Sequence, residues 1–125
     1  MIRYDAYLDY QRERRKLMEE IEYVEHEIQH LRSRAIYKAV KEKQFLDDTI
    51  LLTLLDKKKD LENRIDDLTI KIEEIEQSIL SVPEEFLKPI LWMYYVEGLT
   101  MEKIGEFYGL TSKSIFNHIH AASLP

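Results

Sequence analysis

Residues 100–122 read TMEKIGEFYGLTSKSIFNHIHAA, and this stretch predicts two short helices joined by a tight turn. Ile104, Phe107 and Tyr108 lie at helical spacing, so we expect them to form the apolar face of the first helix. Gly109 is expected to end that helix, because glycine accepts the positive φ that a helix C-terminus often needs. The stretch therefore predicts a compact helical pair at the end of the chain.

The second helix of this pair is expected to begin after Thr111, whose hydroxyl can accept a hydrogen bond from a free backbone N–H. Ile115 and Ile119 are four residues apart and should face the first helix. Gly105 has no side chain, which should let the two helices approach closely. The remaining polar and aromatic positions form the predicted outward face: Ser112, Lys113, Phe116, Asn117 and His120.

Residues 84–122, which include LKPILWMYYVEGLTMEKIGEFYGLTSKSIFNHIHAA, resemble region 4 of sigma-70 factors. With a coiled coil in front, the chain is similar to the ArpU-type late-operon regulators of phages of Gram-positive bacteria. The resemblance implies a helix-turn-helix whose second helix enters the major groove of double-stranded DNA. Sigma region 4 carries several arginines on that helix, whereas Lys113 is the one cation here. The candidate DNA-binding residues are Thr111, Ser112, Lys113, Phe116, Asn117 and His120.

The chain before Pro83 contains no glycine and no other proline, and its apolar residues repeat at helical spacing. Eight residues mark heptad a and d positions in a first segment: Tyr7, Tyr10, Arg14, Leu17, Ile21, Val24, Ile28 and Leu31. Nine mark a second segment: Leu51, Leu54, Lys58, Leu61, Ile65, Leu68, Ile72, Ile75 and Ile79. The two repeats are out of phase by two residues, which no single stutter or stammer explains.

A break between these segments is therefore expected, most simply at Asp47, Asp48 and Thr49, which favour turns and helix caps. The first helix should run past residue 40. Each helix has one apolar stripe that must be buried, so the two should pair with each other, with a second chain, or in both ways. Ile at a with Leu at d in the second segment favours a two-stranded coil between chains. A homodimer is therefore predicted.

Composition excludes several classes of protein. The chain of 125 residues has no cysteine, so it contains neither a disulfide framework nor a thiolate metal site. No signal peptide and no apolar run long enough to span a bilayer is recognisable, so a cytoplasmic location with no membrane partner is expected. The net charge is −6, and residues 84–125 hold three Lys/Arg and five Asp/Glu. Such a segment would release few counterions on DNA, which argues against tight binding by a monomer.

His26-Glu27-Ile28-Gln29-His30 matches the H-E-x-x-H signature of zinc peptidases. Ile28 occupies an a position, so both histidines should lie on the outer side of the coiled coil, where no cleft is expected to form. No catalytic residue, metal site or cofactor is therefore predicted, and the metallopeptidase alternative is discounted.

These observations predict an all-α chain: a long antiparallel helical hairpin or coiled coil over residues 1–82, followed by a helix-turn-helix over residues 83–125. The predicted function is non-catalytic DNA binding in transcription regulation, and the resemblance implies control of phage late genes, packaging or lysis. Asn117 and Lys113 would contact base edges, since asparagine can bind adenine through two hydrogen bonds. The alternative is an adaptor that docks on RNA polymerase or a phage packaging component, with Phe116 as an apolar anchor.

Overall fold

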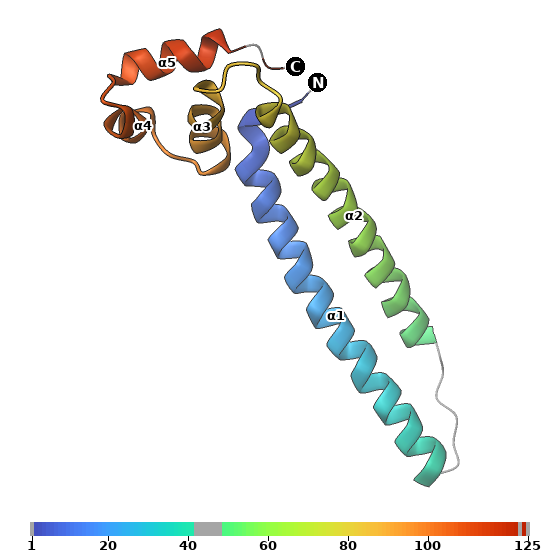
Figure 1. Cartoon of the computed structure of the whole chain (residues 1–125). Coiled ribbons are helices and arrows are strands. Elements are labelled where there is room, and N and C mark those ends of the chain that lie inside the picture. The colour runs from blue at the N-terminus through green and yellow to red at the C-terminus, as the bar shows by residue number, and fades with distance from the viewer. Residues whose placement is uncertain (1, 42–48, 123, 125) are drawn as a thin grey trace. The chain divides into compact units, whose positions relative to one another are not determined.

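The computed structural model describes residues 2–41, 49–122 and 124, and for residues 35–41 it describes the backbone only. Within these residues the regular structure is all helical, with no strand (Figure 1). The elements in chain order are η1 (Tyr4–Ala6), α1 (Tyr7–Lys41), α2 (Thr49–Leu80), α3 (Leu87–Leu91), η2 (Trp92–Val96), α4 (Met101–Tyr108) and α5 (Ser112–Ala121). The predicted all-α class is therefore confirmed. Within the described residues, no helix is both long and apolar enough to cross a membrane.

Backbone contacts divide the chain into two compact units. The helical-pair unit is Glu13–Leu68, and the terminal unit combines Met1–Arg12 with Thr69–Pro125. The long helices α1 and α2 each contribute to both units. The domain boundary predicted after residue 82 rests on the positions of the prolines. The division into units is based on backbone contacts, so that boundary stays a prediction.

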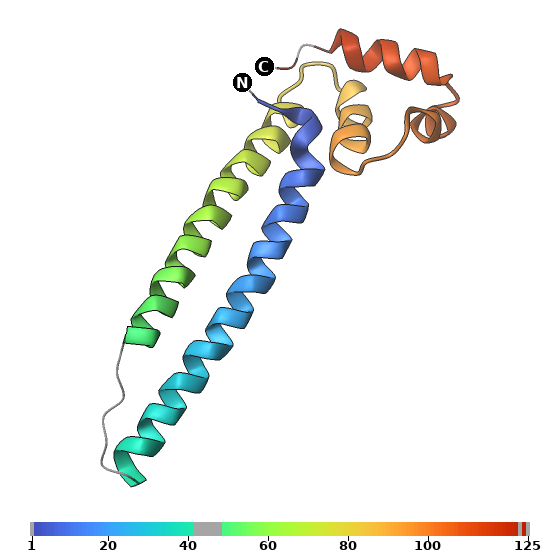
Figure 2. The ribbon, with the colours of Figure 1, turned by 180° about the vertical axis from the view of Figure 1, so that it is seen from behind.

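In the helical-pair unit, α1 and α2 lie side by side with opposite chain directions (Figures 1 and 2). The heptad positions face inward as predicted, and the buried ones in this unit are Leu17, Val24, Ile28, Leu61 and Leu68. Lys58 occupies an a position, where its aliphatic stem is half-buried while its Nζ lies 3.5 Å from Glu25 and 4.0 Å from Glu62. The ammonium thus reaches a carboxylate on each helix, which relieves the cost of a charge in the apolar stripe.

The expected length of the first helix is also confirmed, because α1 continues to Lys41. The second helix begins at Thr49. Asp47 and Asp48, the other two residues of the predicted break, lie outside the described residues.

The terminal unit has one apolar core to which α2, α3, α4 and α5 all contribute. Its buried members are Tyr7, Ile72, Ile75, Ile79, Val82, Leu87, Ile90, Leu91, Ile104, Ile115 and Ile119. Tyr7 ties the start of α1 to α2, because its hydroxyl donates to Glu76 Oε1 at 2.6 Å and accepts from Gln11 Nε2 at 2.9 Å. The first turns of α1 and the last turns of α2 are thereby joined, and both contribute buried residues to the core of this unit.

The prolines mark the connection from α2 to α3. Helix α2 ends at Leu80, as the following Pro83 predicts. Helix α3 begins at Leu87, whose N–H closes a turn on Glu84 O at 3.0 Å. Pro83 therefore lies in the connection, and Pro89 occupies the first turn of α3, where its missing N–H costs no helical hydrogen bond.

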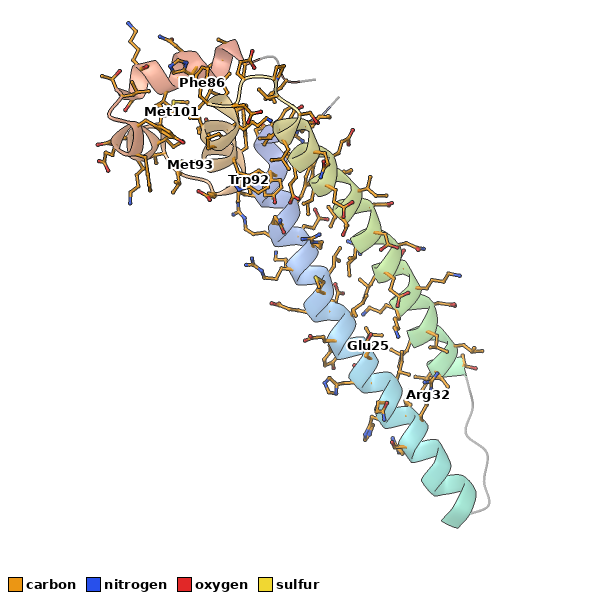
Figure 3. The ribbon with its side chains drawn as sticks, viewed as in Figure 1. Glu25, Arg32, Phe86, Trp92, Met93 and Met101 are labelled. Atoms are coloured by element: carbon orange, nitrogen blue, oxygen red, sulfur yellow. The ribbon has the colours of Figure 1, made fainter. Side chains whose placement is uncertain are left out.

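Helix α3 runs directly into η2, a π-helical turn at Trp92–Val96. The last hydrogen bond of this wider turn runs from Glu97 N–H to Trp92 O at 3.1 Å. Just beyond it, Leu99 N–H donates a hydrogen bond to Met93 O at 2.9 Å. The side chains of Trp92, Met93 and Met101, labelled in Figure 3, are partly buried against the core of this unit. The segment before α4 is thus anchored by packing as well as by backbone bonds.

Candidate functional site

Helix α4 has defined ends at both termini. Thr100 precedes it, and its Oγ1 accepts a hydrogen bond from Lys103 N at 3.2 Å. Gly109 ends it with φ 66° and ψ 30°, the left-handed conformation that the sequence predicts. Leu110 N–H then donates to Gly105 O at 2.9 Å, so the chain folds back over the last turn of α4.

Gly105 is the point of closest approach between α4 and the turn. A Cβ atom placed there would collide with the carbonyl oxygen of Leu110 and lie 3.5 Å from the carbonyl carbon of Thr111. The predicted close approach is therefore confirmed, although the group that covers Gly105 is the backbone of the turn. A side chain at this position would push the start of α5 away from α4.

Helix α5 is fixed by its cap and by its apolar side. Thr111 Oγ1 accepts from Ser114 N at 3.1 Å, which confirms the predicted N-cap. Ile115 has no exposed surface, and Ile119 is also buried in the core of the terminal unit, as predicted. Phe86, labelled in Figure 3, meets His118 of α5 edge on, with ring centroids 5.5 Å apart. The orientation of α5 about its own axis is thus determined by packing.

The prediction that Phe107 and Tyr108 form the inner face of α4 is wrong. Phe107 is 73% exposed and Tyr108 is also exposed. Only Ile104 and Gly105 are buried in this helix, with Met101 partly so. The turn backbone lies over Gly105, and the buried side of α4 is formed by Ile104 and Gly105, while both aromatic side chains remain exposed.

The structure leaves the predicted DNA-binding residues on the surface. All six are exposed: Thr111, Ser112, Lys113, Phe116, Asn117 and His120. From Lys113 onward they recur at helical spacing opposite Ile115 and Ile119. The rings of Phe116 and His120 are in contact, with centroids 4.1 Å apart and planes tilted by 45°, so these two residues form an aromatic pair. The Thr111 hydroxyl is already engaged as the helix cap.

Charge on this surface is sparse. Lys113 is the one Lys or Arg in the sequence of α5. At the start of α3, Lys88 Nζ binds Glu85 Oε1 of the preceding connection at 2.9 Å, which leaves little net positive charge there. What α5 presents is therefore a set of hydrogen-bonding side chains with one cation, and no basic patch.

The H-E-x-x-H histidines, His26 and His30, are exposed on α1 as predicted. The expectation that no cleft forms beside them is wrong, because an open hollow of about 340 Å³ lies there. The apolar side chains of Ile50 and Leu54, on α2, line the other wall of this hollow. No group of three or more potential ligands for a metal ion occurs among the residues that the structure describes.

Sequence reasoning missed the exposed apolar residues around the turn, namely Phe107, Tyr108 and Leu110. The i, i+3, i+4 spacing from Ile104 predicted that Phe107 and Tyr108 are buried, and only the structure shows that they are exposed. Comparison of the chain with protein-family models, with curated proteins and with solved structures finds no match.

Proposed function

We propose that the chain is a non-catalytic DNA-binding regulator of transcription, in which α4 and α5 form a helix-turn-helix and α5 enters the major groove. One observation carries the proposal: Ile115 and Ile119 hold α5 by its inner side, while Lys113 and Asn117 are presented on the outer side. A recognition helix needs this division, because base readout requires side chains held in a fixed orientation. The resemblance to sigma-70 region 4 supports the same reading.

Each exposed residue has a role in this proposal. Asn117 and Lys113 contact base edges, since amide and ammonium groups match the donors and acceptors of the major groove. Ser112 and Thr111 lie at the N-terminal end of α5, where free N–H groups and the helix dipole favour phosphate. The aromatic pair of Phe116 and His120 provides an apolar contact, for example with a thymine methyl group.

Pairing of two chains would compensate for the weak charge of this surface. The terminal segment holds more acidic than basic residues, so one copy alone binds phosphates poorly. The heptad residues that predict a dimer, such as Ile72 and Ile75, are already buried within one chain. A homodimer would therefore use another surface or exchange helices between copies. Light scattering over a dilution series measures this, and a monomer at high concentration would remove the two-half-site scheme.

The proposed setting is the cytoplasm, with control of phage late genes, packaging or lysis, as the resemblance implies. A second candidate function is an adaptor that docks on RNA polymerase. One observation favours it: Phe116 is 45% exposed, and Phe107 and Leu110 are exposed on α4 and the turn. Exposed aromatic side chains are typical anchors of protein interfaces.

The experiment that tests the proposal compares matched alanine variants in a DNA titration at several salt concentrations, followed by site selection. Asn117→Ala should weaken binding to the selected site by about 1–3 kcal/mol and relax preference at one base pair. Asn63→Ala, on the exposed side of α2, is the matched control and should bind normally. Lys113→Ala should weaken binding to the selected site, and it should weaken binding to all sequences more evenly if the partner of Lys113 is a phosphate. The exposed Lys59→Ala should do neither.

Phe116→Ala separates the two candidate functions when it is assayed for both DNA and polymerase binding. Normal DNA binding by Asn117→Ala, together with loss of a polymerase contact in Phe116→Ala, would refute the DNA-reading proposal in favour of the adaptor. Binding with neither a salt slope nor a sequence preference would have the same consequence.

A further inference from the structure

A groove of about 440 Å³ opens in the terminal unit, away from the outward face of α5 except at His120. Its walls come from η1, the start of α1, η2, the loop before α4 and the end of α5. The residues that matter for its chemistry are Tyr4, Asp5, Leu8, Tyr94, Tyr95 and His120. This volume lies within the range of about 300–1,000 Å³ in which proteins bind small molecules.

Three tyrosines line one part of the groove. The Tyr95 ring lies 4.9 Å from that of Tyr94 in an edge-on arrangement and 5.7 Å from that of Tyr4. The π-helical turn η2 places Tyr94 and Tyr95, which are neighbours in sequence, on the same groove. Single π-helical turns of this kind are frequent at functional sites. All three tyrosines are partly buried and line the groove.

Asp5 is the one carboxylate among the residues that line the groove. The Asp5 side chain is 77% exposed, and the guanidinium of Arg3 reaches its Oδ2 at 3.8 Å. Burial raises the pKa of Tyr95, and the neighbouring Tyr94, Asp5 and Tyr4 raise it further. Of these causes, the Asp5 carboxylate is the one that favours a positive charge in the groove and disfavours a phosphate or carboxylate.

We propose that this groove binds a guanidinium group carried on an apolar stem. The planar cation would stack on the tyrosine rings, which attract positive charge through their faces. It would donate to the Asp5 carboxylate, an arrangement that suits the planar guanidinium better than a compact ammonium. Leu8 and Leu99 would contact the stem. Arg3 already brings a guanidinium to the same carboxylate at 3.8 Å, so the ligand would displace it.

Such a group has two sources, a free small molecule or an arginine side chain of another protein. Titration calorimetry with butylguanidine tests the chemistry itself, and butylurea, which is neutral and of similar shape, tests whether charge is needed. The blocked peptide acetyl-Gly-Arg-Gly-amide tests the second source. Tighter binding of butylguanidine than of the peptide assigns the site to a small molecule, and the reverse assigns it to a protein arginine.

Two substitutions at the groove should change the affinity in opposite directions. Asp5→Asn should weaken butylguanidine binding about tenfold, because a charge-assisted bond is lost. Arg3→Ala should tighten it about twofold, since the competing surface ion pair is removed. Asp9→Asn is the matched control: Asp9 is 73% exposed, lies outside the groove and binds Arg12 at 2.9 Å, so its loss should leave the affinity unchanged.

A tightening of binding in Arg3→Ala cannot arise from misfolding, so the test does not depend on a loss of function. Absence of butylguanidine binding, equal binding of butylurea, or equal effects of Asp5→Asn and Asp9→Asn would each overturn the proposal. Because no DNA is present in these titrations, the outcome is independent of the proposed DNA reading.

Discussion

Replacing Gly105 by alanine tests the packing of the turn onto α4 directly. At an ordinary helical position this change stabilises a protein by about 0.5–1 kcal/mol, because glycine loses more backbone entropy on folding. Gly105 lies within α4, where alanine is the better helix former. The local rule therefore predicts a stabilised chain.

The tertiary structure predicts the opposite sign. The new methyl group would collide with Leu110 O, far inside the distance of about 3.3 Å that carbon and oxygen atoms keep. The obstacle is backbone, so no side-chain rotation relieves it. Moving the turn would strain the bond from Leu110 N to Gly105 O, which contributes about 0.5–1.5 kcal/mol, and overpacking costs about 1–3 kcal/mol. After the propensity gain is subtracted, a net loss of about 1–3 kcal/mol is expected.

Trp92 provides the assay, because it is the one tryptophan of the chain and packs on the core of the terminal unit. Urea unfolding followed by its fluorescence reports on that unit, and circular dichroism follows the helical pair separately. The midpoint for Gly105→Ala should fall while the helical-pair transition stays in place. An increase in stability of the size expected from helix propensity would show that the turn does not lie over Gly105, and the argument for the packing of α5 would be wrong.

Three further predictions follow from burial and charge. Ile115→Asp should unfold the terminal unit at a cost of several kcal/mol, because it buries an unpaired carboxylate, while most helical dichroism remains; intact Trp92 fluorescence would contradict this. The raised pKa of Tyr95 means that its contribution to stability is fully present below its ordinary pKa of 10.0 and is lost as pH rises through the folded value. Tyr95→Phe should therefore flatten the alkaline loss of Trp92-monitored stability, whereas Tyr108→Phe, at an exposed position of the same unit, should not. His26→Ala with His30→Ala should change stability by less than about 0.5 kcal/mol, and stoichiometric zinc in the purified protein would contradict the rejection of a metal site.

Local signals determined most of the helical elements. The three-four repeat placed the buried side of α1 and α2, because a helix brings every third or fourth residue to one face whatever its partner is. Thr111 and Gly109 were equally readable, since a cap hydroxyl and a left-handed glycine act on backbone groups only a few residues away. Ile115 and Ile119 were correctly assigned to the core for the same reason.

The sequence could not decide features that depend on which groups meet across the fold. Spacing placed Phe107 and Tyr108 with Ile104, yet the backbone of the turn packs over Gly105, and both rings are exposed. The groove of Tyr4, Asp5 and Tyr95 joins residues about ninety positions apart, and no local pattern links them. Helical periodicity indicates which side of a helix is apolar. Tertiary packing alone decides which partner covers that side and which surface beside it stays exposed.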